Sequence, residues 1–283
     1  MNRAIRPLLA VYDWAVCTEA SSRSSALIRV GLVAVMWARL AYSVILPKML
    51  VSPQYVLLCA GFFVFSTMLL VGLWSRFSCL MMGGVLLSMV HYFGYELGQE
   101  PWTHHHINIL ANSTFLLAFA PVGGSYSVDR WIAVERARRA GVPPPAERGN
   151  IMGLRLIALQ MSAMYLWTAI DKSEGPWLSG ARLDYIAMWY YFPDYPEGWG
   201  VRTLILASAW ATLVLEYALA VGMLFRRTRL WLAPLGYALH GFFYVLLPIR
   251  SFSATVFATY LAFFDPDAVH RLIDRLSGHR QPD

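Results

Sequence analysis

The chain has 283 residues, of which 58% are hydrophobic and only 14% are charged, and its mean hydropathy is +0.48. A single water-soluble domain cannot bury so much apolar surface, so the composition indicates an integral membrane protein. The net charge is +6, but the arginines lie in short loops between apolar stretches, which argues against nucleic-acid binding and favours a role in membrane topology. We therefore predict an all-α, polytopic helical bundle.

The N-terminal 24 residues contain arginines and a short apolar stretch that Asp13 interrupts, and no small-residue cleavage site follows. This pattern predicts an interfacial helix over residues 1–24 instead of a removable signal peptide. The rest of the chain divides into a membrane core over residues 25–265 and a cytoplasmic tail over residues 266–283. We expect residues 1–283 to form a single transmembrane domain.

The membrane core contains about eight apolar stretches, each close to the roughly 20 residues that a helix needs to cross a bilayer. These candidate spans are residues 26–47, 55–74, 77–96, 105–121, 151–171, 202–225, 230–248 and 251–264. The last two are short and Pro248 lies between them. Residues 230–264 therefore form either two full crossings or a re-entrant hairpin.

The 23 Lys and Arg residues are distributed unevenly between the loops. When the N-terminus is placed inside, most of them fall on the cytoplasmic side, and the positive-inside rule then predicts that both termini are cytoplasmic. The cytoplasmic loop over residues 122–150 contains a basic helical stretch and reads as a connector. On the outer side, residues 171–200 are rich in Trp and Tyr, which is typical of a segment along the membrane interface.

Few ionisable residues are predicted at membrane depth, and Arg39, Glu216 and His240 are those that need an explanation. An ionisable group at membrane depth costs about 2.5–3.5 kcal/mol on insertion scales, so each needs a partner or a function. At 1.5 Å per residue, Glu216 lies about 20 Å and Arg39 about 10 Å below the outer boundary, so the two are not expected to pair. Glu216 is either a protonated or hydrogen-bonded structural carboxyl or a functional group.

Three consecutive histidines, His104, His105 and His106, open the fourth span at its outer end. They suggest a metal site, which His91 or His240 could complete. Neighbouring histidines on a helix point about 100° apart, however, so three in a row do not converge on one ion. We therefore predict no metal site, and favour an interfacial or hydrogen-bonding role.

Lys172 ends the fifth span, directly before the aromatic outer segment. A lysine in this position ordinarily extends its ammonium group to water. If the aromatic segment instead folds over it and excludes water, desolvation favours the neutral amine, which can act as a base. The neighbouring Asp171 opposes this effect, but adjacent residues of a helix point in different directions.

Several motifs occur in a characteristic order along residues 24–265. They are Trp102 and His105 in a W-x2-H pattern, then "FLLAF" and "YSVDRW", then Tyr165, Lys172, Trp177 and Gly180 in the pattern Y-x6-K-x4-W-x2-G, and finally Glu216 and His240. In this order and spacing the chain resembles the membrane core of vitamin K-dependent γ-carboxylase and its bacterial relatives, the HTTM family. It resembles a short bacterial form that lacks the luminal domain.

The resemblance implies an enzyme, carboxylase-like or epoxidase-like, that oxidises a reduced quinone (menaquinol or vitamin K hydroquinone) with O2. The strong base so formed removes a proton from a glutamate γ-carbon, to which CO2 adds. Lys172 would deprotonate the hydroquinone and His105 would hydrogen-bond a quinone oxygen. The remaining quinone- or substrate-binding candidates are Trp102, Tyr165, Trp167, Trp177, Arg39, Glu216 and His240.

On this interpretation the protein lies in a bacterial cytoplasmic membrane with its site facing outwards. Quinone enters sideways from the membrane lipid, and an exported peptide or small-molecule substrate approaches from outside, where a partner protein could replace the luminal domain. Two other classes remain open. One is a non-enzymatic maturation or immunity partner of an exported peptide toxin, and the other is a small-solute transporter that uses Glu216 as a proton site.

Overall fold

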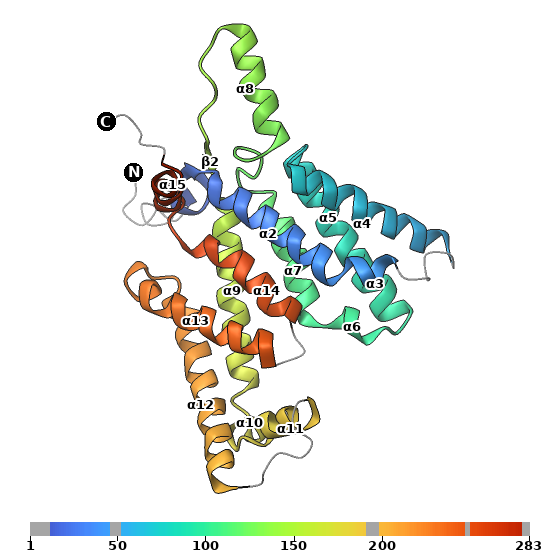
Figure 1. Cartoon of the computed structure of the whole chain (residues 1–283), viewed down its shortest axis with the longest axis vertical. Coiled ribbons are helices and arrows are strands. Elements are labelled where there is room, and N and C mark those ends of the chain that lie inside the picture. Colours follow the sequence, from blue (N-terminus) through green and yellow to red (C-terminus); the bar gives the residue numbers. More distant parts are fainter. Residues whose placement is uncertain (1–11, 46–51, 191–197, 247–249, 279–283) are drawn as a thin grey trace, which may run out of the picture. The chain divides into compact units, whose positions relative to one another are not determined.

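The computed structural model describes residues 12–45, 52–190, 198–246 and 250–278 (Figure 1). Most of these residues are helical, so the predicted all-α class is confirmed. The helical elements are η1 (Asp13–Cys17), α2 (Arg23–Arg39), α3 (Ala41–Ile45), α4 (Pro53–Val71), α5 (Ser75–Met89), η3 (Val90–Glu96), α6 (Glu100–Thr103), α7 (His105–Leu117), α8 (Val128–Ala140), α9 (Met152–Asp171), α10 (Gly175–Leu178), α11 (Ala181–Tyr190), α12 (Trp199–Gly222), α13 (Arg226–Leu246), α14 (Arg250–Thr259), η4 (Tyr260–Phe263) and α15 (Pro266–Leu276).

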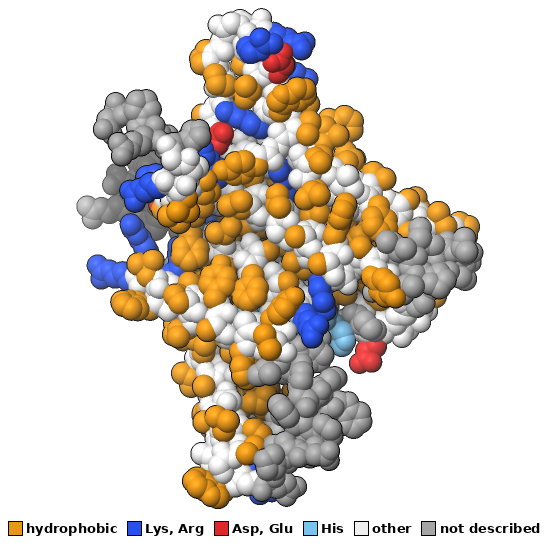
Figure 2. Space-filling view, in the orientation of Figure 1, with side chains coloured by type: hydrophobic (Ala, Val, Ile, Leu, Met, Phe, Trp, Pro, Cys, Tyr) orange, Lys and Arg blue, Asp and Glu red, His pale blue; other side chains and the backbone are white. Residues whose placement is uncertain are grey.

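Each predicted span overlaps at least one of these helices. Among the described residues, Pro53–Val71, Ser75–Glu96 and Trp199–Gly222 are both long and apolar enough to cross a membrane. These three segments support an integral membrane protein, and hydrophobic side chains cover much of the face seen in Figure 2. The total of eight crossings stays a prediction, and Pro248, on which the hairpin alternative depends, lies outside the described residues.

The chain divides into two compact units. The single domain expected from the sequence therefore contains both units. Unit 1 contains residues 1–157 and 258–283, and unit 2 contains residues 158–257. In unit 1, α5 packs closely against α7 because Gly83 faces Phe115, where a Cβ atom would come within 2.9 Å of the phenylalanine Cβ. Small residues at such contacts let membrane helices approach one another.

The turn between α4 and α5 is fixed by the loop that precedes α8. Gly72 ends α4 with a φ of +70°, and a Cβ there would lie 2.3 Å from the Nη1 atom of Arg29, so only glycine fits. The Arg29 side chain is fully buried and donates hydrogen bonds to the carbonyl oxygens of Val122 and Tyr126. Asp129, in the predicted "YSVDRW" motif, accepts hydrogen bonds from the backbone N–H groups on the α5 side of the turn.

The N-terminal prediction requires a correction. Residues 1–11 lie outside the described residues, and within the rest of the predicted interfacial helix Glu19–Ser21 is a strand, β1. It pairs antiparallel with β2 (Arg148–Asn150). The backbone groups of this segment are satisfied by a partner strand more than a hundred residues away, a long-range contact that local helix patterns do not predict.

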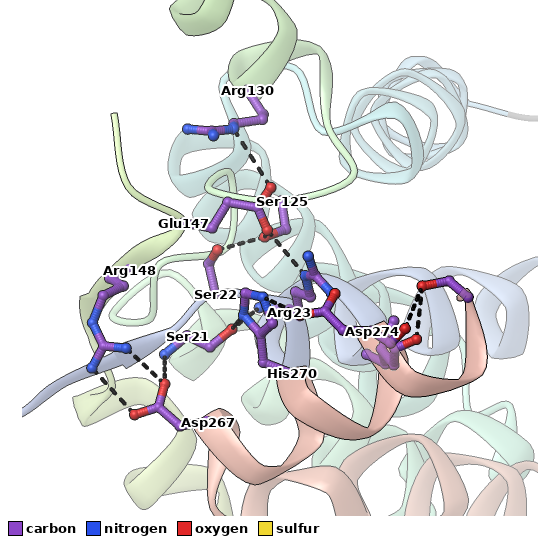
Figure 3. Close-up of polar contacts among 12 residues, drawn as sticks. Ser21, Ser22, Arg23, Ser125, Arg130, Glu147, Arg148, Asp267, His270 and Asp274 are labelled. Atoms are coloured by element: carbon purple, nitrogen blue, oxygen red, sulfur yellow. Dashed lines mark hydrogen bonds and ion pairs between the residues drawn. The ribbon is translucent and has the colours of Figure 1, made fainter. Parts of the chain in front are cut away.

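The predicted cytoplasmic tail also has a fixed structure. Its first part forms α15, which packs against β1 and α2 through a cluster of polar side chains (Figure 3). In the loop over residues 122–150, the predicted basic stretch is helical and forms α8. Lys and Arg side chains gather at one end of the view in Figure 2, over α8.

Candidate functional site

The site in unit 2 is built on one face of α9. Tyr165, Thr168 and Lys172 follow one another at spacings of three and four residues, so they project from the same side of the helix. This side faces α12 and α13, as the contacts below demonstrate. Tyr165 is only 1% exposed, whereas Trp167, on another side of α9, is 70% exposed. Trp167 therefore lies outside this buried cluster, and its role in lining a quinone site stays a prediction.

Lys172 forms an ion pair with Glu216 of α12. Its Nζ atom donates to both carboxylate oxygens, at 3.0 Å to Oε1 and 2.9 Å to Oε2. The side chains are 17% and 5% exposed, respectively, so the pair is largely removed from solvent. The Thr168 side chain lies next to the same carboxylate. Glu216 is thus a paired group, and the Lys172 amine does not extend to bulk water.

Trp177 covers this ion pair. The Lys172 Nζ atom lies 5.2 Å from the centre of its ring, a distance at which a cation is attracted to the aromatic face. The indole N–H donates to the carbonyl oxygen of Ala209 at 2.9 Å, which ties α10 to α12. Trp210 makes the reverse contact, because its indole N–H donates to the carbonyl oxygen of Leu178 at 3.2 Å. The expected aromatic cover over Lys172 is therefore present at Trp177.

The expected difference in depth between Lys172 and Glu216 requires a correction. Lys172 is expected at the outer boundary and Glu216 about 20 Å below it, yet their side chains are in contact. The reason is that α10 does not leave the helix bundle. It packs beside α12 near Ala209, whereas α12 begins ten residues earlier, at Trp199. Glu216 follows Trp199 by about 25 Å of helix, so Lys172 lies well along α12 from its first residue.

A second polar contact lies about two helical turns before Lys172, on the same face of α9. The Tyr165 hydroxyl and His240 Nε2 are 2.7 Å apart, and both residues are buried. The His240 ring packs against Phe243, Phe252 and Phe257, with ring centroids 5.2–6.5 Å apart. The resemblance motifs thus come together in pairs in unit 2, Lys172 with Glu216 and Tyr165 with His240.

The other predicted site residues belong to unit 1. Trp102 is 5% exposed and packs on Phe93 with ring centroids 4.9 Å apart. His105 begins α7, and His104 stacks on His106. Within the described ranges, no group of three or more His, Cys, Asp or Glu residues is arranged to hold a metal ion. The last of these candidates, Arg39, ends α2 and is exposed.

The residues of this arrangement lie within a known protein family domain. The family model described as the HTTM domain matches residues 39–268, which include every predicted site residue. The chain belongs to the HTTM family. The HTTM domain links it to vitamin K-dependent carboxylase-like proteins. No curated protein and no solved structure matches the chain.

The electrostatics of the HTTM site follow from the ion pair. A carboxylate that accepts two hydrogen bonds from an ammonium group offsets the cost of burying both charges. The same hydrogen bonds offer a direct route for the proton. Transfer from Lys172 to Glu216 yields a neutral amine and a neutral carboxylic acid without creating a net charge in the apolar interior.

The ion pair between Lys172 and Glu216 was not predicted from the sequence, and neither was a neighbouring contact of the HTTM domain. The hydroxyl groups of Ser173 and Tyr217 are 2.9 Å apart, with the same sequence offset as Lys172 and Glu216. Ser173 and Tyr217 carried no recognisable signal. The ion pair did carry one, because Glu216 is an isolated acid in an apolar helix and Lys172 is an isolated base at the end of another.

Proposed function

We propose that the protein is a membrane enzyme that couples oxidation of a reduced quinone by O2 to proton abstraction from an exported peptide or small substrate. The substrate is then carboxylated or modified in a related way. One observation carries this proposal, namely that the HTTM-motif lysine is held against a buried carboxylate beneath Trp177. Such an arrangement is typical of a base that works in a dry site.

The residues around Lys172 fit a quinol chemically. A quinol is a flat apolar ring with ionisable hydroxyl groups, and here an aromatic ring lies beside an amine and a carboxylate. In this proposal Glu216 takes the ammonium proton, and Lys172 then accepts a proton from the hydroxyl group of the bound quinol. Trp177 excludes water from the amine. The quinol supplies the electrons that reduce O2.

The other roles implied by the resemblance belong to the same proposal. His105 hydrogen-bonds a quinone oxygen, and Trp102, Arg39, Tyr165 and His240 shape the quinone or substrate site. The protein crosses a bacterial cytoplasmic membrane about eight times with both termini in the cytoplasm. The site opens towards the outer side, so quinol reaches it through the lipid, and CO2 and an external substrate or partner protein reach it from outside.

Oxygen consumption by the purified protein in lipid nanodiscs tests the proposal. We expect O2 uptake when menaquinol is added, and a loss of at least about 100-fold in Lys172→Ala, which is the usual range for a general base. Quinone should still bind to this variant, measured by extraction and absorbance. The control is Arg202→Gln, an exposed charged residue in the first turn of α12 that should leave uptake unchanged.

Two results would overturn the enzymatic proposal. They are the absence of menaquinol-dependent uptake in the native protein, and uptake in Lys172→Ala equal to that of the control. In either case the non-enzymatic partner of an exported peptide becomes the better hypothesis. Transport remains less favoured, because Glu216 is ion-paired with Lys172 instead of being an isolated proton site.

A further inference from the structure

Helix α15 presents two chemically different faces. One face packs against β1, β2 and α2 of the same unit through three side chains (Figure 3). Asp267 pairs with Arg148 at 2.9 Å, and Asp274 pairs with Arg23. Between them, Nδ1 of His270 lies 2.7 Å from the buried Ser21 hydroxyl. The acidic residues of α15 are therefore used to hold the helix in place.

The exposed side of α15 is basic and apolar, with the leucines opposite the docked face and the arginines at its flank. Leu272 is 55% exposed and Leu276 is 80% exposed, and Arg271 and Arg275 are exposed beside them. In the part of the chain that the structure describes, neither arginine forms an ion pair. Asp267 and Asp274 pair with Arg148 and Arg23, and Asp267 offsets the charge of Arg271 only in part, at a distance beyond an ion pair, so positive charge remains beside two large apolar side chains.

The predicted topology gives α15 a level relative to the bilayer. Two residues, Phe264 and Asp265, separate it from η4, which ends the last predicted span. In Figure 1, α15 is seen end-on, whereas α2, which it contacts, is seen along its length. Since α2 belongs to the first predicted span, α15 lies across the direction of the membrane helices, as an interfacial helix does.

We propose that Arg271, Leu272, Arg275 and Leu276 form a binding surface for the anionic lipid headgroups of the cytoplasmic leaflet. The two guanidinium groups bind headgroup phosphates, and the two leucines enter the boundary between headgroups and acyl chains. Most of α15 lies outside the HTTM match, which ends at residue 268. The surface is thus separate from the proposed enzymatic site, and its occupancy does not depend on that activity.

Charge selects the occupant of this surface. An acidic protein partner or a second copy of the chain could also cover exposed leucines. A second copy, however, would bring Arg271 and Arg275 against identical positive charges across a two-fold interface. In the predicted topology a lipid surface lies next to α15, since the last span ends two residues before it, and basic residues at a cytoplasmic leaflet bind anionic lipids.

Site-specific fluorescence quenching tests the proposal. A bimane label is attached to Leu276→Cys in a Cys17→Ser background, because Cys17 is exposed whereas Cys59 and Cys79 are buried. The protein is reconstituted in nanodiscs that contain brominated phosphatidylglycerol or brominated phosphatidylcholine at equal mole fractions. We expect quenching in both, with a relative association constant about fivefold or more in favour of the anionic lipid.

Variants of the arginines show whether the lipid preference depends on their charge or only on the closeness of α15 to the lipid. Arg271→Gln with Arg275→Gln should remove the lipid preference, whereas Arg138→Gln with Arg139→Gln, an equal loss of charge on α8, should not. Thermal unfolding of each variant verifies that it is folded. An unquenched label, equal quenching by the two lipids, or an unchanged preference in the α15 variant would overturn the proposal. Concentration-dependent bimane self-quenching without lipid quenching would instead assign the face to a second copy.

Discussion

At the scale of single residues, the most consequential contact is that between Lys172 and Glu216. Each charge alone would be costly at membrane depth. Together the two residues form a hydrogen-bonded ion pair with no net charge. Removing one partner of a buried pair costs more than replacing both by apolar residues, because the remaining group is left without compensation. Each partner is therefore needed for stability while the other is present, although the pair as a whole adds little compared with two apolar residues.

A double-mutant cycle in detergent micelles measures this coupling. We expect Lys172→Met to lower the free energy of unfolding by about 3 kcal/mol, because it strands the Glu216 carboxylate. Adding Glu216→Leu should restore most of this loss, to within about 1 kcal/mol of the native protein. Equilibrium unfolding followed by circular dichroism gives the values. If the double variant is as unstable as the sum of the single variants, the two side chains are not coupled.

At the scale of elements, α15 depends on charged contacts for its position. Burial by itself raises the pKa of Asp267, but hydrogen bonds from Arg148 and from the backbone N–H of Ser21 outweigh it and hold the pKa below its usual value. A carboxylate whose pKa is lowered on folding stabilises the folded state at a pH above its unfolded pKa. The stabilisation is lost as the pH falls through the lowered, folded-state pKa.

Hydrogen exchange of α15 amides tests this dependence. At pH 7, we expect Asp267→Asn to make local opening of α15 easier by about 1 kcal/mol, since the contact is partly exposed. The difference from the native protein should vanish in acid, below the folded-state pKa of Asp267, because the native carboxyl is then also neutral. Ser277→Ala, at the other end of the helix, serves as the control. A difference that persists unchanged in acid would exclude the ion pair as its cause.

At the scale of the whole molecule, the orientation in the membrane rests on the distribution of positive charge. We expect Val142→Cys, exposed in the loop after α8, to react with a membrane-impermeant maleimide only from the cytoplasmic side. Arg202→Cys, exposed in the first turn of α12, should react only from the outer side. Both variants are made in the Cys17→Ser background. Labelling of both positions from one side would contradict the predicted topology.

The elements could largely be predicted from local sequence. The apolar stretch 55–74 corresponds to α4. The helix begins at Pro53, where the Ser52 hydroxyl accepts a hydrogen bond from the backbone N–H of Tyr55, and it ends before Gly72. The stretch 151–171 matches α9 almost residue for residue. These boundaries are set by contacts within a few residues of the chain, such as caps and apolar runs.

What the sequence by itself determined is the class of the protein, the approximate helices and the family motifs, because composition, helix length and spacing are local properties. Only the tertiary structure decided which motif residues meet, namely Lys172 with Glu216 and Tyr165 with His240. It also decided that β1 pairs with β2 and that α15 docks beside them. The physical reason is that hydropathy indicates where each helix by itself would lie in the bilayer. The shift and rotation of one helix relative to another depend on the packing of side chains between them.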